Sequence, residues 1–287
     1  MPARIAIVTT VELASPDADE AALLPHLPEA ALVAWDDPAV DWAGFDVAIL
    51  RSTWNYHDDL DGFLAWARHA SSLTRLLNPV DTVAWNTDKR YLADLAAAGF
   101  PVVPTTFVAP GDAVPDDAVV GLGGHLVVKP SVGAGSNGAR LFDGDAAGAA
   151  AHVAALHAQG KVAMIQPYLA EVDTTGETAL VYLGGRFSHA ARKGAILSRD
   201  MSFDTGLYAD EEITSATATA AERALADSLV AALPGMGHPG LAYVRVDLLP
   251  TADGPVVLEL ELTEPSLFLT LDPEAPVRAA EAFRALL

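Results

Sequence analysis

Residues 126–138 read Leu-Val-Val-Lys-Pro-Ser-Val-Gly-Ala-Gly-Ser-Asn-Gly, and this stretch decides the fold. The apolar run predicts a buried strand that ends at Lys129, directly before a glycine-rich loop. The loop matches G-x-G-x-x-G, but a dinucleotide-binding fingerprint has to open a helix, whereas residues 139–144 read as a short strand and a turn. We therefore expect a strand, a loop that closes over phosphates with backbone N–H groups, and a second strand. Taken alone, the loop fits an ordinary long hairpin equally well.

Lysine is scarce in this chain, with four lysines against thirteen arginines. A lysine is therefore more often than usual a required compact charge, as phosphate oxygens need. Lys129, at the end of a buried strand, fits that use, whereas Lys161 beside Gly160 is interpreted as a solvated residue at a helix end. The P-loop pattern G-x-x-x-x-G-K-[ST] does not occur in the sequence, so P-loop chemistry is excluded.

Paired acids mark two strands near the end of the chain. Strict alternation puts Glu259 and Glu261 on one face of a strand, and Arg245 and Asp247 on one face of another. If these strands form a hairpin, Asp247 stands opposite Glu259 and Arg245 opposite Glu261. Facing carboxylates need a cation, and oxygen ligands favour magnesium or manganese over zinc. The alternative is an exposed acidic face in which Arg245 neutralises Glu261.

The whole chain of 287 residues is long enough for a substantial core, and 51% of it is hydrophobic. Its formal net charge of -21 repels nucleic acid and anionic membranes, so we expect neither as a partner. There is no cysteine, which excludes disulfides, thiolate zinc sites and a cysteine nucleophile. No uninterrupted run of about 18 apolar residues occurs. We expect a soluble, cytoplasmic protein and leave open a homo-oligomer.

The N-terminal part predicts a small α/β unit. Apolar runs at 4–10 and 46–51 read as buried strands that end in polar residues, where a parallel sheet places its ligand edge. Apolar residues at helical spacing predict a helix over 58–69, so that 51–56 is a strand-to-helix loop. We place the first domain boundary near residue 80.

Beyond this boundary, Asn86 or Thr87 is expected to cap a helix that runs through Ala98 and ends at Gly99. Short strands around the glycine-rich loop and a helix over about 145–158 then predict a compact α+β module. The later predicted elements are strands at 178–183, 187–192, 243–249 and 256–262, and helices at 219–233 and from about 274.

Several motifs occur together in a fairly specific order. They are Lys89, Lys129 with its loop, Gln-Pro-Tyr-Leu at 166–169, and then Asp247 and Glu259. In this order the chain resembles the glutathione-synthetase-like branch of the ATP-grasp superfamily. Arg-Ser-Thr-Trp-Asn-Tyr at 51–56, Trp-Asn-Thr-Asp-Lys at 85–89 and Glu-Leu-Glu-Leu-Thr-Glu-Pro-Ser-Leu at 259–267 are more closely similar to the D-cycloserine ligase (O-ureidoserine cyclo-ligase) group. The resemblance spans nearly the whole chain.

The resemblance implies an ATP-grasp fold of the α/β and α+β classes. It divides the chain into a Rossmann-like pre-ATP-grasp domain at 1–80, a small lid subdomain at 81–166 and a C-terminal subdomain with a mixed sheet at 167–287. It also implies a ligase that forms a C–N bond in antibiotic biosynthesis, through an acyl phosphate and with release of ADP and phosphate. A small amino-acid-like substrate and ring closure follow from the resemblance alone.

Carried over position by position, the resemblance implies a site for ATP and two magnesium ions, with manganese as the alternative metal. The phosphate-binding residues would be Lys89, Lys129, Ser131, Gly133, Gly135, Ser136, Asn137 and Gly138. The adenine hinge would be Gln166, Pro167, Tyr168 and Leu169, with Glu171 or Asp173 near the ribose. The metal ligands would be Asp247, Glu259 and Glu261. The family pattern ends in Glu-x-Asn, so Glu261 departs from it and either binds metal or faces Arg245.

The segment 186–193 would serve the acyl phosphate and the oxyanion formed when it is attacked. Its candidates are Arg192, Lys193 and His189, of which Arg192 is preferred because a lone histidine is more often structural. Substrate-binding groups would be Arg51, Ser52, Thr53, Tyr56 and Ser266, since Arg51 can fork a carboxylate. Two other functions stay open: a phosphotransferase that releases a stable phosphorylated product, and a nucleotide-binding module without turnover.

Overall fold

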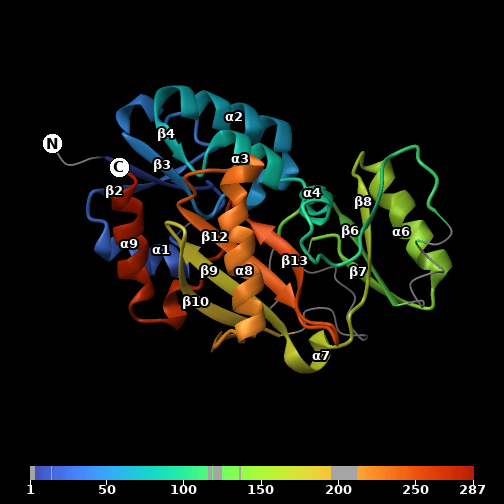
Figure 1. The fold of residues 1–287 in the computed structure, drawn as a ribbon. Coiled ribbons are helices and arrows are strands. Elements are labelled where there is room, and N and C mark those ends of the chain that lie inside the picture. Colours follow the sequence, from blue (N-terminus) through green and yellow to red (C-terminus); the bar gives the residue numbers. More distant parts are fainter. Residues whose placement is uncertain (1–3, 14, 116–117, 119–124, 136, 195–211) are drawn as a thin grey trace.

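The computed structural model describes residues 4–13, 15–115, 118, 125–135, 137–194 and 212–287. Its strands form three sheets, which we call the N-terminal sheet, the lid sheet and the central sheet. In Figure 1 the lid sheet and its helix stand to the right of a larger body that contains the other two sheets.

The N-terminal sheet has the order β2-β1-β3-β4, and its strands are parallel. Its elements are β1 (Ile5–Thr9), α1 (Ala18–Leu23), η1 (Leu24–His26), β2 (Ala30–Ala34), η2 (Trp42–Gly44), β3 (Val47–Leu50), η3 (Trp54–Asp58), α2 (Leu60–Leu73) and β4 (Arg75–Leu77). Buried apolar residues on both faces explain why β1 and β3 read as continuous apolar runs. The predicted α/β unit and its strand-to-helix loop are confirmed.

Two short helices follow, α3 (Val80–Asn86) and α4 (Tyr91–Ala97). The expected cap at Asn86 or Thr87 is wrong, because α4 begins at Tyr91 without a side-chain cap. The amide of Asn86 instead bonds the backbone of a distant strand, donating to Leu260 O at 2.7 Å and accepting from Leu262 N at 2.7 Å. A tertiary contact thus uses the side chain that local sequence assigns to a helix end.

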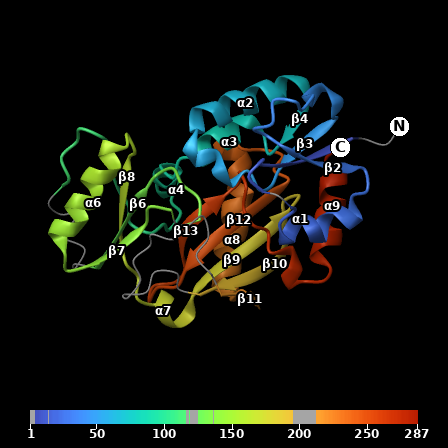
Figure 2. The ribbon, with the colours of Figure 1, turned by 180° about the vertical axis from the view of Figure 1, so that it is seen from behind.

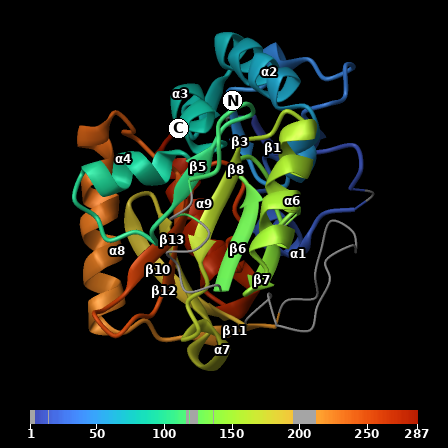
Figure 3. The ribbon, with the colours of Figure 1, turned by 90° about the vertical axis from the view of Figure 1, so that its right-hand side faces the viewer.

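The lid sheet has the order β5-β8-β6-β7, and its pairs are antiparallel. Its elements are β5 (Thr106–Val108), β6 (His125–Pro130), β7 (Arg140–Asp143), α6 (Ala146–Ala158) and β8 (Ala163–Pro167). The loop after Lys129 therefore joins two paired strands, as predicted. Asp145 caps α6 by accepting from Gly148 N at 2.8 Å. Figure 3 shows α6 on the outer side of the lid sheet.

The central sheet has the order β11-β10-β9-β12-β13. The elements of this part are α7 (Val172–Thr175), β9 (Glu177–Leu183), β10 (Arg186–Lys193), β11 (Ile213–Ala216), α8 (Ala220–Ala232), η4 (Leu233–Met236), β12 (Tyr243–Leu249), β13 (Val256–Glu261), η5 (Leu269–Leu271) and α9 (Ala275–Ala285). The expected mixed sheet is instead antiparallel in each of its described strand pairs, because hairpins join β9 to β10 and β12 to β13. Val257 of β13 also forms an isolated parallel β-bridge with Val102.

The predicted register of the last hairpin is confirmed, since Asp247 pairs with Glu259 and Arg245 with Glu261. A register shift directly after Asp247 lies between this paired region and the turn.

The two faces of the central sheet have different neighbours. One face packs against α8 and α4 through Leu180, Val244 and Val246. The other face shares a core with β1, β3, α1 and α9 at the end that carries Val181 and Tyr243. The view from behind, in Figure 2, shows α1 and α9 packed together beside β10. The remainder of this second face is turned toward the lid sheet.

Candidate active site

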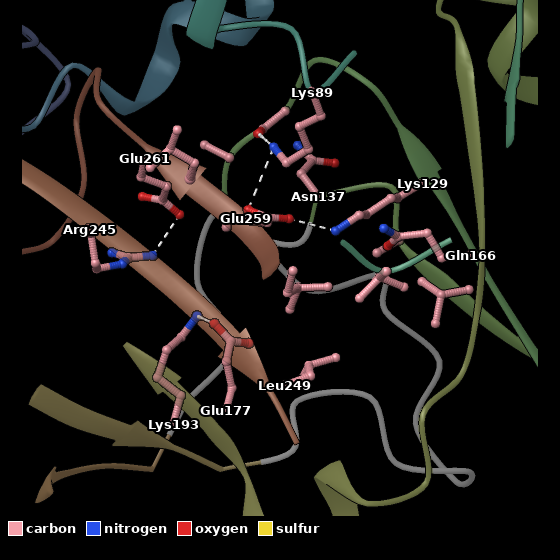
Figure 4. Close-up of a pocket in the computed structure, with 18 of the residues that line it drawn as sticks. Lys89, Lys129, Asn137, Gln166, Glu177, Lys193, Arg245, Leu249, Glu259 and Glu261 are labelled. Atoms are coloured by element: carbon pink, nitrogen blue, oxygen red, sulfur yellow. Dashed lines mark hydrogen bonds and ion pairs between the residues drawn. The ribbon is translucent and has the colours of Figure 1, made fainter. Parts of the chain in front are cut away.

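A cavity of about 480 Å³ lies between the lid sheet and the central sheet. Strand alternation brings the charged residues to it, because Glu177, Lys193 and Arg245 occupy one face of adjacent strands. The predicted site residues that line it are Tyr56, Lys89, Lys129, Gly133, Gly135, Asn137, Gln166, Pro167, Tyr168, Leu169, Lys193, Glu259, Glu261 and Ser266. Figure 4 shows ten of the lining residues pointing toward this space. The lysine-flanked loop and the acidic strand pair therefore share one cavity.

Lys129 crosses the cavity to the acidic strand pair. Its Nζ lies 2.5 Å from Oε1 of Glu259, and Lys89 Nζ lies 3.9 Å from the other oxygen of that carboxylate (Figure 4). Lys89 also donates to Gly133 O at 2.8 Å, so it touches the glycine-rich loop. Burial alone would raise the pKa of Glu259, but Lys129 and Lys89 outweigh it and hold that pKa at about 2. The glutamate is ionised, and its charge is shared by two lysines.

Arg245 organises the opposite side of the acidic pair. Its guanidinium donates to both oxygens of Asp247 at 2.8 Å, to Glu261 at 2.6 Å and to Ser266 O at 2.9 Å. The guanidinium carbon lies 5.1 Å from the ring centre of Phe268, a cation–π contact. Burial would raise the pKa of Asp247, but Arg245 and then Lys193 hold it far below its usual range. Glu261 thus faces Arg245, as one of the two sequence interpretations expected.

The three acids expected to bind metal are not equally available. Glu259 and Glu261 line the cavity, whereas Asp247 is 1% exposed and lies behind Arg245. Within the described residues, no three acids or histidines converge so as to hold a metal ion by themselves. Magnesium, however, is usually bound by one or two carboxylates together with phosphate oxygens and waters. The oxygen donors of Glu259 and Glu261 fit such an ion.

Lys193 and Arg192 lie on opposite faces of β10, as neighbouring strand residues must. Lys193 lines the cavity and lies 2.7 Å from Glu177 and 3.5 Å from Asp247. Arg192 lies on the face of β10 that is covered by α8, close enough to Glu222 of that helix for an electrostatic interaction. The structure thus brings Lys193 into the cavity and does not bring Arg192 there.

His189 also lies outside the cavity. Its Nε2 donates to Leu267 O at 2.7 Å, and its Nδ1 lies 2.9 Å from Ser188 Oγ. Burial lowers the pKa of His189, which favours the neutral ring. Its contacts in the structure are structural ones.

The expected substrate-binding segment lies beside the cavity at the carboxyl end of β3. Tyr56 lines the cavity, but Arg51 and Ser52 are buried behind it. Arg51 donates to Pro265 O and lies 3.7 Å from Asp19, while its Nε and Nη1 have no hydrogen-bond partner in the described structure. Thr53 Oγ1 is likewise buried without a partner there. Arg51 therefore has donors left for a ligand or a rearranged neighbour.

The remaining residues predicted to bind the nucleotide, so far as the structure describes them, are not among those that line the cavity. Ser131 is buried, and its carbonyl accepts from Lys89 N at 2.8 Å, so it fixes Lys89 rather than lining the cavity. Gly138 has a φ of +75° and accepts from His152 Nε2 at 2.8 Å. Asp173 accepts from Tyr168 Oη, and Glu171 is exposed. Ser136 lies outside the described residues.

Three charged residues that line the cavity were not assigned a site role from the sequence. Strand alternation places Arg245 beside Asp247, but the sequence indicated for it only the role of neutralising Glu261. Glu264 belongs to the motif at 259–267, from which only Glu259, Glu261 and Ser266 were assigned roles. Glu177 directly begins β9 without any local motif. Burial, and then Glu261, raise the pKa of Glu264 to about 8 against Lys89, Arg245 and Arg51.

Comparisons with known proteins agree with this geometry. Residues 5–78 match the family model described as D-cycloserine synthetase DcsG, N-terminal domain. The cycloserine biosynthesis protein DcsG of Streptomyces lavendulae is 40% identical over 270 residues, which are 86% of this chain and 85% of that protein. The crystal structure of D-cycloserine synthetase DcsG matches with a TM-score of 0.86 at 37% identity, covering 99% of each chain.

A more distant structure shows the fold alone. The D-alanine–D-alanine ligase of Bacillus anthracis complexed with ATP matches with a TM-score of 0.66 at 15% identity, covering 99% of this chain and 98% of that one. No helix among the described residues is long and apolar enough to cross a membrane. The fold is that of the ATP-grasp ligases, and the chain belongs to the D-cycloserine synthetase (DcsG) family.

Proposed function

We propose that this chain is an ATP-dependent carboxylate–amine ligase that closes a ring in a small amino-acid-like substrate, as in D-cycloserine formation. The observation that carries the proposal is the shared cavity, in which Lys89, Lys129, Lys193 and Arg245 surround Glu259 and Glu261. The 40% identity to a cycloserine biosynthesis protein supports the specific outcome.

In the proposed mechanism, the substrate carboxylate first takes the γ-phosphoryl group of ATP, because a carboxylate is a poor electrophile. Phosphoryl transfer needs positioning and charge neutralisation more than covalent help from the protein. Lys89 and Lys129 would bind the phosphates, and backbone N–H groups of the glycine-rich loop would cover them. An amine of the same substrate then attacks the acyl phosphate, and ADP and phosphate leave.

In this mechanism Arg245 would stabilise the oxyanion formed in that attack. Its guanidinium is buried and held by Asp247 and by Ser266 O, so little reorganisation is needed when charge develops near it. Lys193 lines the same side of the cavity, while Glu177 holds its ammonium group. These two cations take the role that the sequence assigned to Arg192 and Lys193.

Two magnesium ions are part of the proposal, held by Glu259, Glu261 and nucleotide oxygens. When bound, they would neutralise phosphate charge during the transfer. Lys129 would release Glu259 and turn to the phosphates. Because ATP is a cytoplasmic metabolite, we propose a cytoplasmic enzyme.

The test is ADP release by the purified protein with ATP, magnesium and a panel of amino acids that includes O-ureidoserine. We expect ADP only with a suitable substrate, together with a ring-closed product by mass spectrometry. Hydroxylamine added during turnover should give a hydroxamate, since it captures an acyl phosphate. A stable phosphorylated product without hydroxamate would show a phosphotransferase, and nucleotide binding without ADP across the panel would show a non-catalytic module.

A further inference from the structure

The acids that line the cavity differ in whether the protein neutralises them. Three of the four face a cation of the same cavity. The three pairs, with their N–O distances, are Lys193–Glu177 at 2.7 Å, Lys129–Glu259 at 2.5 Å and Arg245–Glu261 at 2.6 Å. The fourth is Glu264, whose carboxyl group has no hydrogen bond or ion pair with any described residue. The cavity therefore has one acid with which no described residue forms an ion pair.

The backbone around Glu264 is fixed, so this acid is held in place. The carbonyl of Glu264 accepts from Trp54 Nε1 at 3.1 Å, and the next carbonyl, that of Pro265, accepts from Arg51. One residue further, Ser266 O accepts from Arg245 Nη1 at 2.9 Å. Contacts from both the N-terminal sheet region and the central sheet thus hold the loop that presents Glu264.

Glu264 and the expected adenine hinge line the cavity from different elements. Gln166 and its neighbours belong to β8 of the lid sheet, whereas Glu264 follows β13 and lies near Tyr56. Lys89 and Lys129 are the cations proposed for the phosphates, and in the described structure both face Glu259 and neither forms an ion pair with Glu264. Glu264 is therefore suited to the second substrate rather than to ATP.

We propose that Glu264 is a specificity residue that binds a cationic amine of the substrate, the α-ammonium group of an amino acid. This inference rests on the proposed function, because it assigns a group of the amino-acid-like substrate to one residue of the same cavity. A carboxylate gives an ammonium group a charge-assisted hydrogen bond, which is about twice as strong as a neutral one. It also distinguishes an amino acid from its desamino counterpart, which would leave the acid without a partner.

The experiment is a cycle of protein and ligand changes, measured by calorimetric titration in the presence of magnesium and AMPPNP. The ligands are O-ureidoserine and its desamino counterpart, and the proteins are the wild type and Glu264→Gln. We expect loss of the ammonium group to weaken binding to the wild type by roughly 10- to 100-fold. Glu264→Gln should weaken O-ureidoserine binding by a similar factor and bind both ligands almost equally.

Two controls separate this role from a structural one. Glu281→Gln, which changes an exposed acid of α9, should leave both affinities as in the wild type. AMPPNP should bind Glu264→Gln as tightly as the wild type, since Glu264 is assigned to the other substrate. If Glu264→Gln binds O-ureidoserine within about twofold of the wild type, or if loss of the ammonium group weakens both proteins equally, the inference is wrong.

The same cycle with D-serine and 3-hydroxypropanoate separates this inference from the ligase proposal. A preference for ammonium that disappears in Glu264→Gln, without ADP formation by the wild type on any substrate, would leave the inference standing and end the ligase proposal. If instead the wild type forms ADP but binds amino acids no more tightly than their desamino counterparts, the ligase proposal stands and the inference about Glu264 is wrong.

Discussion

Asp19 Oδ2 accepts a hydrogen bond from the backbone N–H of Phe268 at 3.1 Å, although the two residues are 249 positions apart. The same carboxylate accepts from Leu267 N at 2.5 Å and Leu269 N at 2.7 Å. Phe268 has a φ of +52°, in the left-handed region that side chains rarely adopt. Its ring lies against Arg245, so Asp19 supports the guanidinium of the active site from the N-terminal domain.

Asp19→Asn should therefore lower both stability and turnover. The amide keeps one acceptor oxygen but places an NH₂ group against backbone donors, which costs about 1–3 kcal/mol of unfolding free energy. If Arg245 acts on the reacting carboxyl group, kcat should fall more than nucleotide affinity. Urea unfolding, steady-state kinetics and AMPPNP titration measure the three quantities. Asp253→Asn, at an exposed turn, is the control. Equal stability of Asp19→Asn and the wild type would contradict the prediction.

Lys129→Met tests the lid side of the cavity. The substitution keeps the length of the side chain but removes the charge that faces Glu259 at 2.5 Å. Loss of one charge-assisted phosphate contact predicts roughly 10- to 100-fold weaker AMPPNP binding in calorimetric titration. The matched control is Lys161→Met, because Lys161 does not line the cavity. Equal nucleotide affinity of the two variants would show that Lys129 does not contact phosphate.

Features with a strict local period could be predicted from the sequence. The pairing of Asp247 with Glu259 follows from the period of two along a strand and from a short turn. The assumption that these strands form a hairpin was therefore enough to predict it. The same period requires the neighbouring residues Arg192 and Lys193 to lie on opposite faces, so the prediction that both serve one site was wrong. The period does not say which face meets a cavity. That choice depends on α8, which packs on the face that carries Arg192.

Features that depend on tertiary contacts could not be predicted. Asn86 is a residue type that often caps helices, yet its side chain bonds Leu260 of β13 and Leu262, which directly follows that strand. Asp19 lies in a short N-terminal helix, and no local pattern connects it with Phe268. Glu264 was visible as part of a polar loop, but its lack of a cation is known only when its neighbours are placed.

Gly176→Ala should destabilise the protein more than Gly185→Ala. Both glycines have a positive φ, +72° and +75°, so each substitution costs about 1–3 kcal/mol of backbone strain. A Cβ at Gly176 would also lie 2.5 Å from Lys193 O, whereas nothing lies within 4 Å of a Cβ at Gly185. The clash of the new Cβ with the carbonyl of Lys193 should also displace Lys193 and lower turnover. Equal unfolding free energies in urea would contradict this account.

The last prediction concerns the pH dependence of stability. Burial and Glu261 raise the pKa of Glu264 from an ordinary 4.5 to about 8. The folded chain therefore holds a proton that the unfolded chain has lost, so this group contributes stability that is full below 4.5 and is lost as the pH rises through 8. Glu264→Gln has no such proton. The unfolding free energy of the wild type, relative to this variant, should fall by on the order of 4 kcal/mol between about pH 5 and about pH 9. Parallel pH profiles of the two proteins would show instead that Glu264 is ionised in the empty cavity, with a cation or water supplying the partner that the chain does not.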